Sequence, residues 1–190
     1  MPAARLLAFP ATDPTSGLTV LTPAEWRTLA ALVDQVWPRT GALPSATEAG
    51  VLTYLHRRFT GDLPGYRIRG RPAADPTLAA LYRKLCARTD ALAGGAFSAL
   101  PPSARKPVVE RLSAGSKADV GYHVVGSPDP ATARDPELFA LLRRHVLEGT
   151  FCDPRSGGNR DYRAWEGIGH VCHSNYPRPH RCDPVRKQHR

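Results

Sequence analysis

The sequence lacks any long hydrophobic run. No window of its 190 residues approaches the roughly 18 consecutive apolar residues that a membrane-spanning helix needs. The opening stretch, MPAARLLAFP, holds an apolar run too short for the core of a secretory leader. The arginine pairs at 57–58 and 143–144 lie inside helical patterns and not ahead of an apolar leader. We therefore expect a soluble protein whose export leader is either absent or already removed.

Cysteine and alternating β-type patterns are also scarce. Four cysteines are too few for a disulfide scaffold, although three of them fall in the last forty residues. Runs that alternate apolar and polar residues are nearly absent, and at most residues 122–125 could pair as a strand. An apolar fraction of 42% suffices for one core, with an extended tail besides. These features favour a single helical domain.

Two helices are predicted in the first third of the chain. A capping box, TPAE at residues 22–25, precedes the first helix, which stops before Pro38. A second capping box, SATE at residues 45–48, precedes a helix that ends at Gly61. The apolar residues at helical spacing that we expect to face the core are Trp26, Leu29, Ala30, Val33, Val36, Trp37, Val51, Leu52, Leu55 and Phe59.

A surface loop rich in Gly, Pro and Arg is expected over residues 61–74. The third helix then opens at Asp75-Pro76 and ends at the glycines 94–95. Its expected buried stripe consists of Leu78, Leu81, Tyr82, Leu85, Thr89 and Leu92. Cys86 lies beside that stripe, so we expect a small buried hydrophobe and not a reactive thiol.

The last two predicted helices are marked by proline. A short helical turn from residue 96 and a break at the prolines 101–102 precede a helix capped by Ser103, in which Pro107 falls near the first turn. The fifth helix opens at residues 135–137, with Leu138, Phe139, Leu142 and Val146 facing inward, and it is expected to stop at Gly149.

The predicted fold is therefore all-α. About five amphipathic helices form one compact domain, followed by a long irregular C-terminal tail. Residues 1–20 form an irregular N-terminal segment, residues 21–150 the helical domain, and residues 151–190 the tail, which contains Gly, Pro and Cys. Ordering such a tail would cost roughly 1–2 kcal/mol per residue. Its larger apolar residues nevertheless need a surface, on this domain or on another chain: Phe151, Tyr162, Trp165, Ile168 and Tyr176.

The net charge of +9 raises nucleic acid as a possible partner. Residues 155–190 hold eight Lys and Arg against three Asp and Glu, so about half of the excess lies in the tail. The earlier basic residues have no aromatics interleaved with them, and no nucleic-acid-binding motif is present. A solvated basic surface is the preferred interpretation, and an acidic protein partner or a polyanion stays open.

The tail also offers metal ligands and a disulfide. His170, Cys172, His173, His180 and Cys182 lie close together in sequence, but their spacings fit a zinc site poorly. Cys172 and Cys182 are separated by nine residues with two prolines, a workable loop for a disulfide in an oxidising compartment. That pairing would leave Cys152 in an exposed turn, available for a bond to another chain.

Catalysis and nucleotide binding have weaker support. Cys152 or Cys172 as a nucleophile would need a base and an oxyanion hole, and no nucleophile elbow or cysteine-protease signature surrounds either residue. The stretch Gly157-Gly158-Asn159 has the chemistry of a turn. A phosphate-binding loop would need a strand before it and a helix directly after it, so nucleotide binding is not expected.

Three stretches towards the end of the chain stand out: LLRRHVLEGTFCDP at residues 141–154, GGN at 157–159 and WEGIG at 165–169. They resemble the C-terminal signature of the gluconate 2-dehydrogenase subunit 3 family, a helix followed by an EG-F-DP-x-x-GGN turn and a W-x-x-x-G close. LTPAE at 21–25, DQVWP at 34–38, ATEAGV at 46–51 and YL at 54–55 agree with its first two helices. The likeness spans roughly residues 20–170, and the GGN loop is its most specific part.

The resemblance implies a non-catalytic small subunit of a heteromer. Its partner would be a large FAD-dependent oxidoreductase of the glucose-methanol-choline type that oxidises a sugar, a sugar acid, a glycoside or a related alcohol, often with a cytochrome c subunit as the next electron carrier. FAD would belong to the partner, and this chain would bind no cofactor. The small subunit would act as a chaperone in folding, flavin loading and export, usually by lending a twin-arginine leader. We expect a periplasmic or extracellular complex if it is exported, and a cytoplasmic one otherwise.

The residues themselves are in keeping with this role. The histidines are scattered or in the tail, and no paired carboxylates share a helical face in an evident pocket. We expect no catalytic, cofactor-binding or metal residue, and a disulfide between Cys172 and Cys182. The expected partner contacts are Phe151, Cys152, Asp153, Gly157, Gly158, Asn159 and Trp165. A zinc-binding or basic nucleic-acid-binding module that uses the His- and Cys-rich tail is the alternative.

Overall fold

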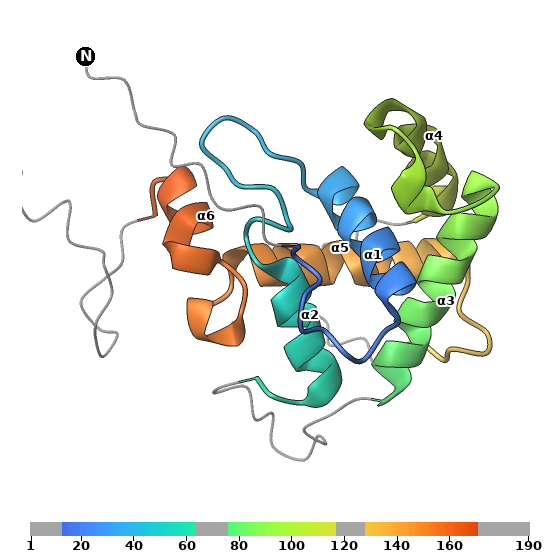
Figure 1. Ribbon diagram of the computed structural model, residues 1–190, viewed down its shortest axis with the longest axis horizontal. Helices are drawn as coiled ribbons and strands as arrows, with labels where there is room; N and C mark the ends of the chain where they lie inside the picture. The colour runs from blue at the N-terminus through green and yellow to red at the C-terminus, as the bar shows by residue number, and fades with distance from the viewer. Residues whose placement is uncertain (1–12, 64–75, 117–127, 171–190) are drawn as a thin grey trace, which may run out of the picture.

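The computed structural model describes residues 13–63, 76–116 and 128–170. Within these ranges six α-helices and three 3-10 turns form, and no strand does (Figure 1). The helices are α1 (Pro23–Val36), α2 (Val51–Thr60), α3 (Pro76–Ala93), α4 (Pro102–Ser113), α5 (Asp135–Phe151) and α6 (Arg163–Gly167). The 3-10 turns are η1 (Phe97–Ala99), η2 (Pro154–Ser156) and η3 (Arg160–Tyr162). The all-α prediction is confirmed.

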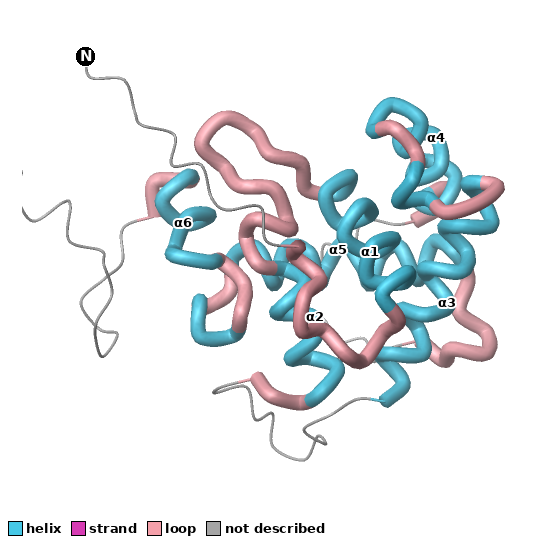
Figure 2. The backbone as a smooth tube through the Cα atoms, in the orientation of Figure 1, coloured by secondary structure: helices cyan, strands magenta, loops and turns pink. Residues whose placement is uncertain are grey.

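Helix α5 organises the domain, because it contacts α1, α2, α3, α4 and α6. It runs across the molecule in Figures 1 and 2, behind α1 and α2, with α3 and α4 near its N-terminal end. Helix α6 lies at the other end, beyond the C-terminus of α5. The two ends of the domain are therefore built differently, α3 and α4 at one and α6 with its loop at the other.

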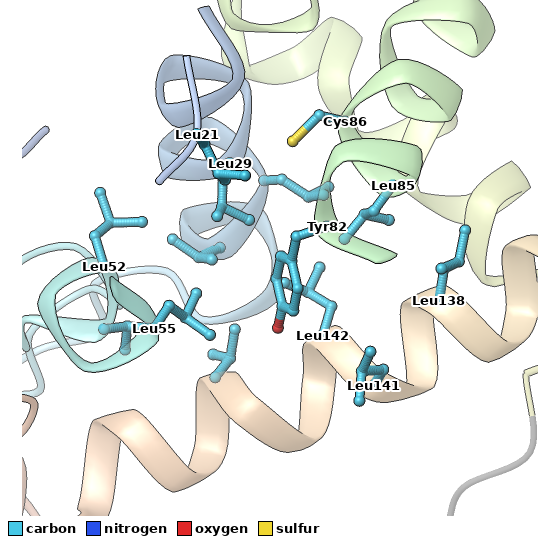
Figure 3. Packing of buried hydrophobic residues seen from close by; sticks show 14 of the residues in the cluster. Leu21, Leu29, Leu52, Leu55, Tyr82, Leu85, Cys86, Leu138, Leu141 and Leu142 are labelled. Carbon is cyan, nitrogen blue, oxygen red and sulfur yellow. The ribbon is translucent and has the colours of Figure 1, made fainter. Parts of the chain in front are cut away.

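The core is aliphatic with a few aromatic residues. Leucines from α1, α2, α3 and α5 converge on one another in Figure 3. Trp26, Tyr82 and Phe97 are the largest of the fully buried side chains. Each large side chain removed from water contributes roughly 2 kcal/mol before entropy is counted. The predicted burial of Cys86 is confirmed, since 1% of its surface is exposed, whereas Ala30, Val36 and Trp37 are only partly buried.

The start of α1 agrees with the prediction in detail. The Thr22 hydroxyl accepts a hydrogen bond from the backbone N–H of Glu25 (3.2 Å), and the Glu25 carboxylate accepts one from the backbone N–H of Thr22 (2.7 Å). Pro23 occupies the first helical position, where no N–H donor is needed. The reciprocal capping box of the sequence is therefore present.

The predicted start of the second helix is wrong. The Ser45 and Glu48 bonds of the capping box do form, with the Ser45 N–H 2.8 Å from the Glu48 carboxylate. The helix itself begins only at Val51, because Gly50 adopts a left-handed conformation with φ 87°. Asp34 of α1 accepts bonds from the N–H and the hydroxyl of Thr47, at 2.8 and 2.7 Å, and so fixes the turn before the helix.

Two other predicted helix ends differ. Helix α4 begins at Pro102 and is not capped by Ser103; proline at the first position needs no donor, and Pro107 lies inside the helix. Helix α5 does not stop at Gly149 but continues to Phe151. The ends of α2 at Gly61 and of α3 before Gly94 agree with the sequence.

Some predictions lie outside the described residues. These are most of the loop at 61–74, the possible strand at 122–125, and the part of the tail beyond residue 170. Among the helices that are described, none combines the length and the apolar composition required to cross a bilayer.

Candidate functional site at the C-terminal end of the domain

Gly149 marks the point where α5 crosses α2. A Cβ at this position would lie 2.9 Å from Cδ1 of Tyr54 and 3.3 Å from a methyl group of Val51. Such distances are too short for a methyl group, so only glycine allows the two helices to come this close. The glycine that the sequence indicated as a helix stop is therefore a packing contact.

A polar cluster fastens the same crossing. The Tyr54 hydroxyl donates to the Glu148 carboxylate (2.8 Å), and Arg58 donates to the Tyr54 oxygen (3.3 Å). Arg58 also forms an ion pair with Glu148 (3.5 Å). Burial raises the pKa of Tyr54, and the Glu148 carboxylate raises it further. The phenol is thus a stable hydrogen-bond donor, and Glu148 holds α5 to α2.

After α5 the chain turns back on itself. The Asp153 carboxylate accepts a hydrogen bond from the N–H of Arg155 (2.9 Å) and opens the turn η2. Arg57 of α2 donates to the carbonyl oxygen of Arg155. Gly157, with φ 97°, then reverses the chain direction against Thr53 of α2. Helix α2 thus holds this loop through Arg57 and Thr53.

At the adjacent glycines Gly157 and Gly158, the backbone of the loop packs directly on the backbone of other segments. A Cβ on Gly158 would lie 1.9 Å from the carbonyl oxygen of Gly149 and 2.9 Å from Sγ of Cys152. A Cβ on Gly50 would lie 2.6 Å from the carbonyl oxygen of Gly157. The start of α2, the end of α5 and the loop therefore meet where no side chain fits.

Asn159 is the hydrogen-bonding centre of the loop and is fully buried. Its amide group donates to the carbonyl of Cys152 (3.1 Å), and its amide oxygen accepts from the N–H groups of Ala164 (3.1 Å) and Trp165 (3.4 Å). Its own backbone N–H donates to the Gly149 carbonyl (3.0 Å). One side chain thus ties the end of α5 to the start of α6.

Three nearby residues hold a left-handed backbone without being glycine. Asn159 has φ 40°, Asp161 has φ 56° and Tyr162 has φ 62°. Each such residue costs on the order of 1 kcal/mol. The contacts of Asn159 and of the aromatic residues beyond it offset that cost, so the loop depends on them for its shape.

Aromatic side chains continue the structure outward from the loop. The indole N–H of Trp165 donates to the carbonyl of Phe151 (2.9 Å). The Phe151 ring meets Trp37 edge-on, with the ring centres 5.4 Å apart. Tyr162 and His170 flank the Trp165 ring at 5.8 and 5.1 Å. We call Trp37, Phe151, Tyr162 and Trp165 the aromatic face; all four are partly buried.

The predicted partner contacts divide into two groups. Gly158 and Asn159 are buried within this chain, where they hold the loop. Phe151, Cys152, Asp153, Gly157 and Trp165 are partly exposed. Residues 151–170, the first half of the expected irregular tail, carry η2, η3 and α6 and rest on α2 and α5. The surface that they needed is supplied, in part, by their own domain.

Sequence reasoning named Ile168 among the apolar residues that need a surface, but it missed Leu147. Among the described residues, the exposed large hydrophobic side chains are Ile168 (55%) and Leu147 (42%). Ile168 follows α6, and Leu147 lies on α5 one helical turn before Phe151. Leu147 falls outside the buried stripe of α5, and an apolar residue outside such a stripe was the available signal.

Cys152 follows the last residue of α5 and is partly buried, not in an exposed turn as expected. Its thiol lies 3.4 Å from the Gly149 carbonyl oxygen. Burial raises the pKa of Cys152 to about 11. The thiol is therefore protonated near neutral pH, which disfavours the nucleophilic role considered from the sequence.

The core holds a histidine that the sequence analysis did not single out. His145 of α5 is fully buried, and its Nδ1 lies 2.9 Å from the Tyr82 hydroxyl. Its Nε2 has no hydrogen-bond partner among the described residues. Burial lowers the pKa of His145 well below 6.5, and Arg58 and Arg144 lower it further. His145 is neutral and contributes to packing; its place on the apolar stripe of α5 was the signal for it.

The predicted metal ligands and the predicted disulfide mostly lie outside the described residues. Of the five candidate ligands only His170 is described, and it is exposed beside Trp165. Within residues 13–63, 76–116 and 128–170 no group of three metal-binding side chains gathers. Cys172 and Cys182 are not described, so their pairing stays a prediction.

These features define a helical domain closed by a glycine-rich loop that fixes a short C-terminal helix. The chain belongs to the gluconate 2-dehydrogenase subunit 3 family, whose model matches residues 23–171. The resemblance seen in the sequence is thereby confirmed. The family name describes a subunit of a dehydrogenase complex. Neither a search of curated proteins nor a search of solved structures found a match.

Proposed function

We propose that this chain is a non-catalytic small subunit that binds, stabilises and helps to mature a large FAD-dependent oxidoreductase of the glucose-methanol-choline type. The partner oxidises a sugar, a sugar acid or a glycoside, and a cytochrome c subunit accepts its electrons. The complex works in the periplasm or outside the cell. Membership of a dehydrogenase-subunit family supports the proposal.

The proposal rests on what the residues of the family signature do in the structure. Glu148, Gly149, Gly158 and Asn159 are all engaged in holding α2, α5 and α6 together. Two groups of α5 that could perform acid–base chemistry are engaged as well: Glu148 binds Tyr54 and Arg58, and His145 is buried against Tyr82. The most family-specific part of the sequence therefore has a structural role.

The same loop does not fit a flavin. A dinucleotide-binding loop presents free backbone N–H groups of a helix N-terminus to a pyrophosphate. Here the glycine pair lies against the Gly149 carbonyl and Thr53, and the N–H of Gly157 is bonded to Pro154. The N-terminal N–H groups of α6 are bonded to the side chain of Asn159. This supports the assignment of FAD to the partner.

Co-expression with the neighbouring large-subunit reading frame tests the function. The large subunit should be purified with and without this chain, and its FAD content and dehydrogenase activity measured. We expect a yellow, active enzyme only when this chain is present. Full flavin loading and activity of the large subunit alone, with no stable complex, would contradict the proposal. The isolated small subunit serves as the control and should show no turnover.

A covalent link through Cys152 to the partner stays a prediction. Joining two thiols requires a disulfide-donating oxidoreductase to accept two electrons and two protons. Because the pKa of Cys152 is raised to about 11, attack by this thiol is slow near neutral pH. Electrophoresis of the complex with and without a reductant, beside a Cys152→Ser variant, checks the link. An unchanged small-subunit band would disprove it.

A further inference from the structure

We propose that residues 163–170, which include α6, form a lid that opens on a strained hinge while α1–α5 stay folded. The hinge consists of Asp161 and Tyr162, and the structure shows the closed lid. Because Tyr162 and Trp165 belong to the aromatic face, that face is complete only when the lid is closed. The inference concerns this chain alone and does not rest on the proposed function.

The hinge joins two adjacent residues with a left-handed backbone. Among the described residues, the non-glycine residues with positive φ are Asn159, Asp161 and Tyr162, and the other positive-φ residues are glycines. In this conformation a Cβ crowds the following carbonyl oxygen, and a bulky residue such as tyrosine adopts it rarely. Such residues persist only where other contacts hold them, and they cluster at clamps and switch regions. Relaxation of either hinge residue would turn α6 relative to α5.

The chain before the hinge is fixed on the domain. The backbone N–H of Asn159 donates to the carbonyl of Gly149 (3.0 Å), and that of Arg160 donates to the carbonyl of Ala49 (2.9 Å). These two bonds tie the chain to the end of α5 and to the segment before α2. Asp161 is the first residue beyond them and is exposed. A movement of the lid therefore begins at Asp161.

Beyond the hinge, side-chain contacts hold the lid closed. The side-chain oxygen of Asn159 accepts hydrogen bonds from the N–H groups of Ala164 (3.1 Å) and Trp165 (3.4 Å). The indole N–H of Trp165 donates to the carbonyl of Phe151 (2.9 Å), and Ala164 is fully buried. Opening breaks these bonds and uncovers the last residue of α5, Phe151.

The lid is small and lies beyond the C-terminal end of α5 (Figure 1). Helix α6 has five residues, too few for a helix that is stable on its own. The N–H groups of Ile168, Gly169 and His170 donate to carbonyls three to five residues earlier, within the lid. All three residues are exposed, and Gly167 packs against Leu43 of the loop between α1 and α2. A segment anchored in this way opens at a lower free energy than the whole domain unfolds.

Hydrogen exchange of the full-length chain tests the lid, with Leu112→Ala as the comparison variant. Leu112 of α4 is fully buried, so its truncation destabilises the folded domain. We expect exchange of the slowest amides of α5 to become about a hundredfold faster in this variant. The amides of residues 164, 165 and 168–170 should exchange at wild-type rates, because the lid opens without unfolding the core.

The wild type gives a second measurement that needs no substitution. In low concentrations of denaturant the slowest amides of α5 should exchange faster, since global unfolding exposes much surface, whereas the lid amides should change little. Lid amides that follow the α5 amides in either experiment would show that the lid opens only with the whole domain, and would overturn the inference. Lid amides without protection in the wild type would overturn it as well, because no closed lid would exist.

The hinge is tested at Asp161, whose side chain is exposed. Asp161→Val and Asp161→Asn both remove the charge, but valine is poorly accommodated at φ 56°, whereas asparagine tolerates this conformation. The lid amides should therefore exchange about fivefold faster, or more, in Asp161→Val than in Asp161→Asn. Equal rates in the two variants would show that the hinge holds no strain, and would overturn the inference.

Discussion

The two ends of this domain are stabilised in different ways. Around α1, α3 and α4 the chain relies on buried aliphatic and aromatic side chains such as Leu81, Phe97 and Leu112. Around the loop between α5 and α6 it relies on glycines that let backbone meet backbone, and on one buried amide, Asn159. The first kind of contact tolerates changes of shape, because neighbouring side chains can adjust; the second does not.

This difference separates the aliphatic core from the loop that positions α6. A core of side chains accepts other apolar residues at modest cost. At position 158 only glycine fits, because a Cβ there would lie 1.9 Å from the carbonyl oxygen of Gly149. The family-specific GGN stretch lies in the second kind of structure. Its role is to fix α6, and thereby the exposed Ile168, on a rigid domain.

The largest effect is expected for Gly158→Ala. The added methyl group would meet the Gly149 carbonyl oxygen at 1.9 Å, so the loop must move away from α5. We expect a loss of about 4 kcal/mol in the free energy of unfolding, measured by denaturant titration. Gly95→Ala is the matched control: no described atom lies within 4 Å of its Cβ position, so stability should stay within about 1 kcal/mol. Equal stability of the two variants would refute the backbone contact.

The aliphatic side of the comparison is tested by Leu142→Ala. Leu142 of α5 is fully buried, so its truncation leaves a cavity in the core. The expected loss is about 3 kcal/mol. Loop residues 152–165 should keep their native hydrogen-exchange protection relative to the rest of the domain, which distinguishes this variant from Gly158→Ala. A selective loss of protection in the loop would argue that the loop depends on packing at Leu142.

A smaller loss, about 2 kcal/mol, is expected for Asn159→Ala. The substitution leaves the Cys152 carbonyl and the Ala164 N–H without their partner in a buried place. Asn159→Asp keeps the acceptor for α6 but turns a buried carboxylate oxygen toward the Cys152 carbonyl oxygen, so near neutral pH it should be at least as destabilising as alanine. The order of the three proteins in thermal unfolding checks the assignment, and a neutral alanine variant contradicts it.

The pH dependence of stability should be dominated near neutrality by His145. Its pKa is lowered by burial and by Arg58 and Arg144, with the Tyr82 hydroxyl as its partner from α3. The unfolded chain therefore takes up a proton first as the pH falls below 6.5. Stability should be constant above that pH and fall below it, by at most about 1.4 kcal/mol per pH unit. His145→Gln should flatten this slope, and an unchanged slope would rule His145 out.

The sequence predicted the helices best where local chemistry decides the outcome. The capping box before α1 involves residues within four positions of one another, so Thr22 and Glu25 could be recognised directly. The role of Gly149 could not be recognised from the sequence, because a glycine after an apolar stripe is typical both of a helix end and of a close helix crossing. Only the position of Tyr54 in the structure decides between the two. The start of α2 was misplaced for the same reason: Gly50 lies against the carbonyl oxygen of Gly157, and this contact cannot be seen in the local sequence.

The candidate site was predictable in part. Resemblance identified the GGN stretch, and its turn chemistry was read correctly from Gly157 and Asn159. The inward orientation of Gly158 and Asn159 could not be foreseen, since it requires the end of α5 to lie beside the loop. Exposure of Ile168 likewise follows from how Ala164 and Gly167 seat α6 on the domain.

The central claim is the proposal that this chain binds a flavoprotein, with the predicted partner contacts Phe151 and Trp165 at the end of the domain that carries α6. Hydrogen exchange of the chain, free and in complex with the large subunit, tests it most directly. We predict that the amides of residues 160–170 gain protection in the complex, while those of α3 and α4 exchange as they do in the free chain. Protection gained on α3 and α4 with none on residues 160–170 would contradict the account.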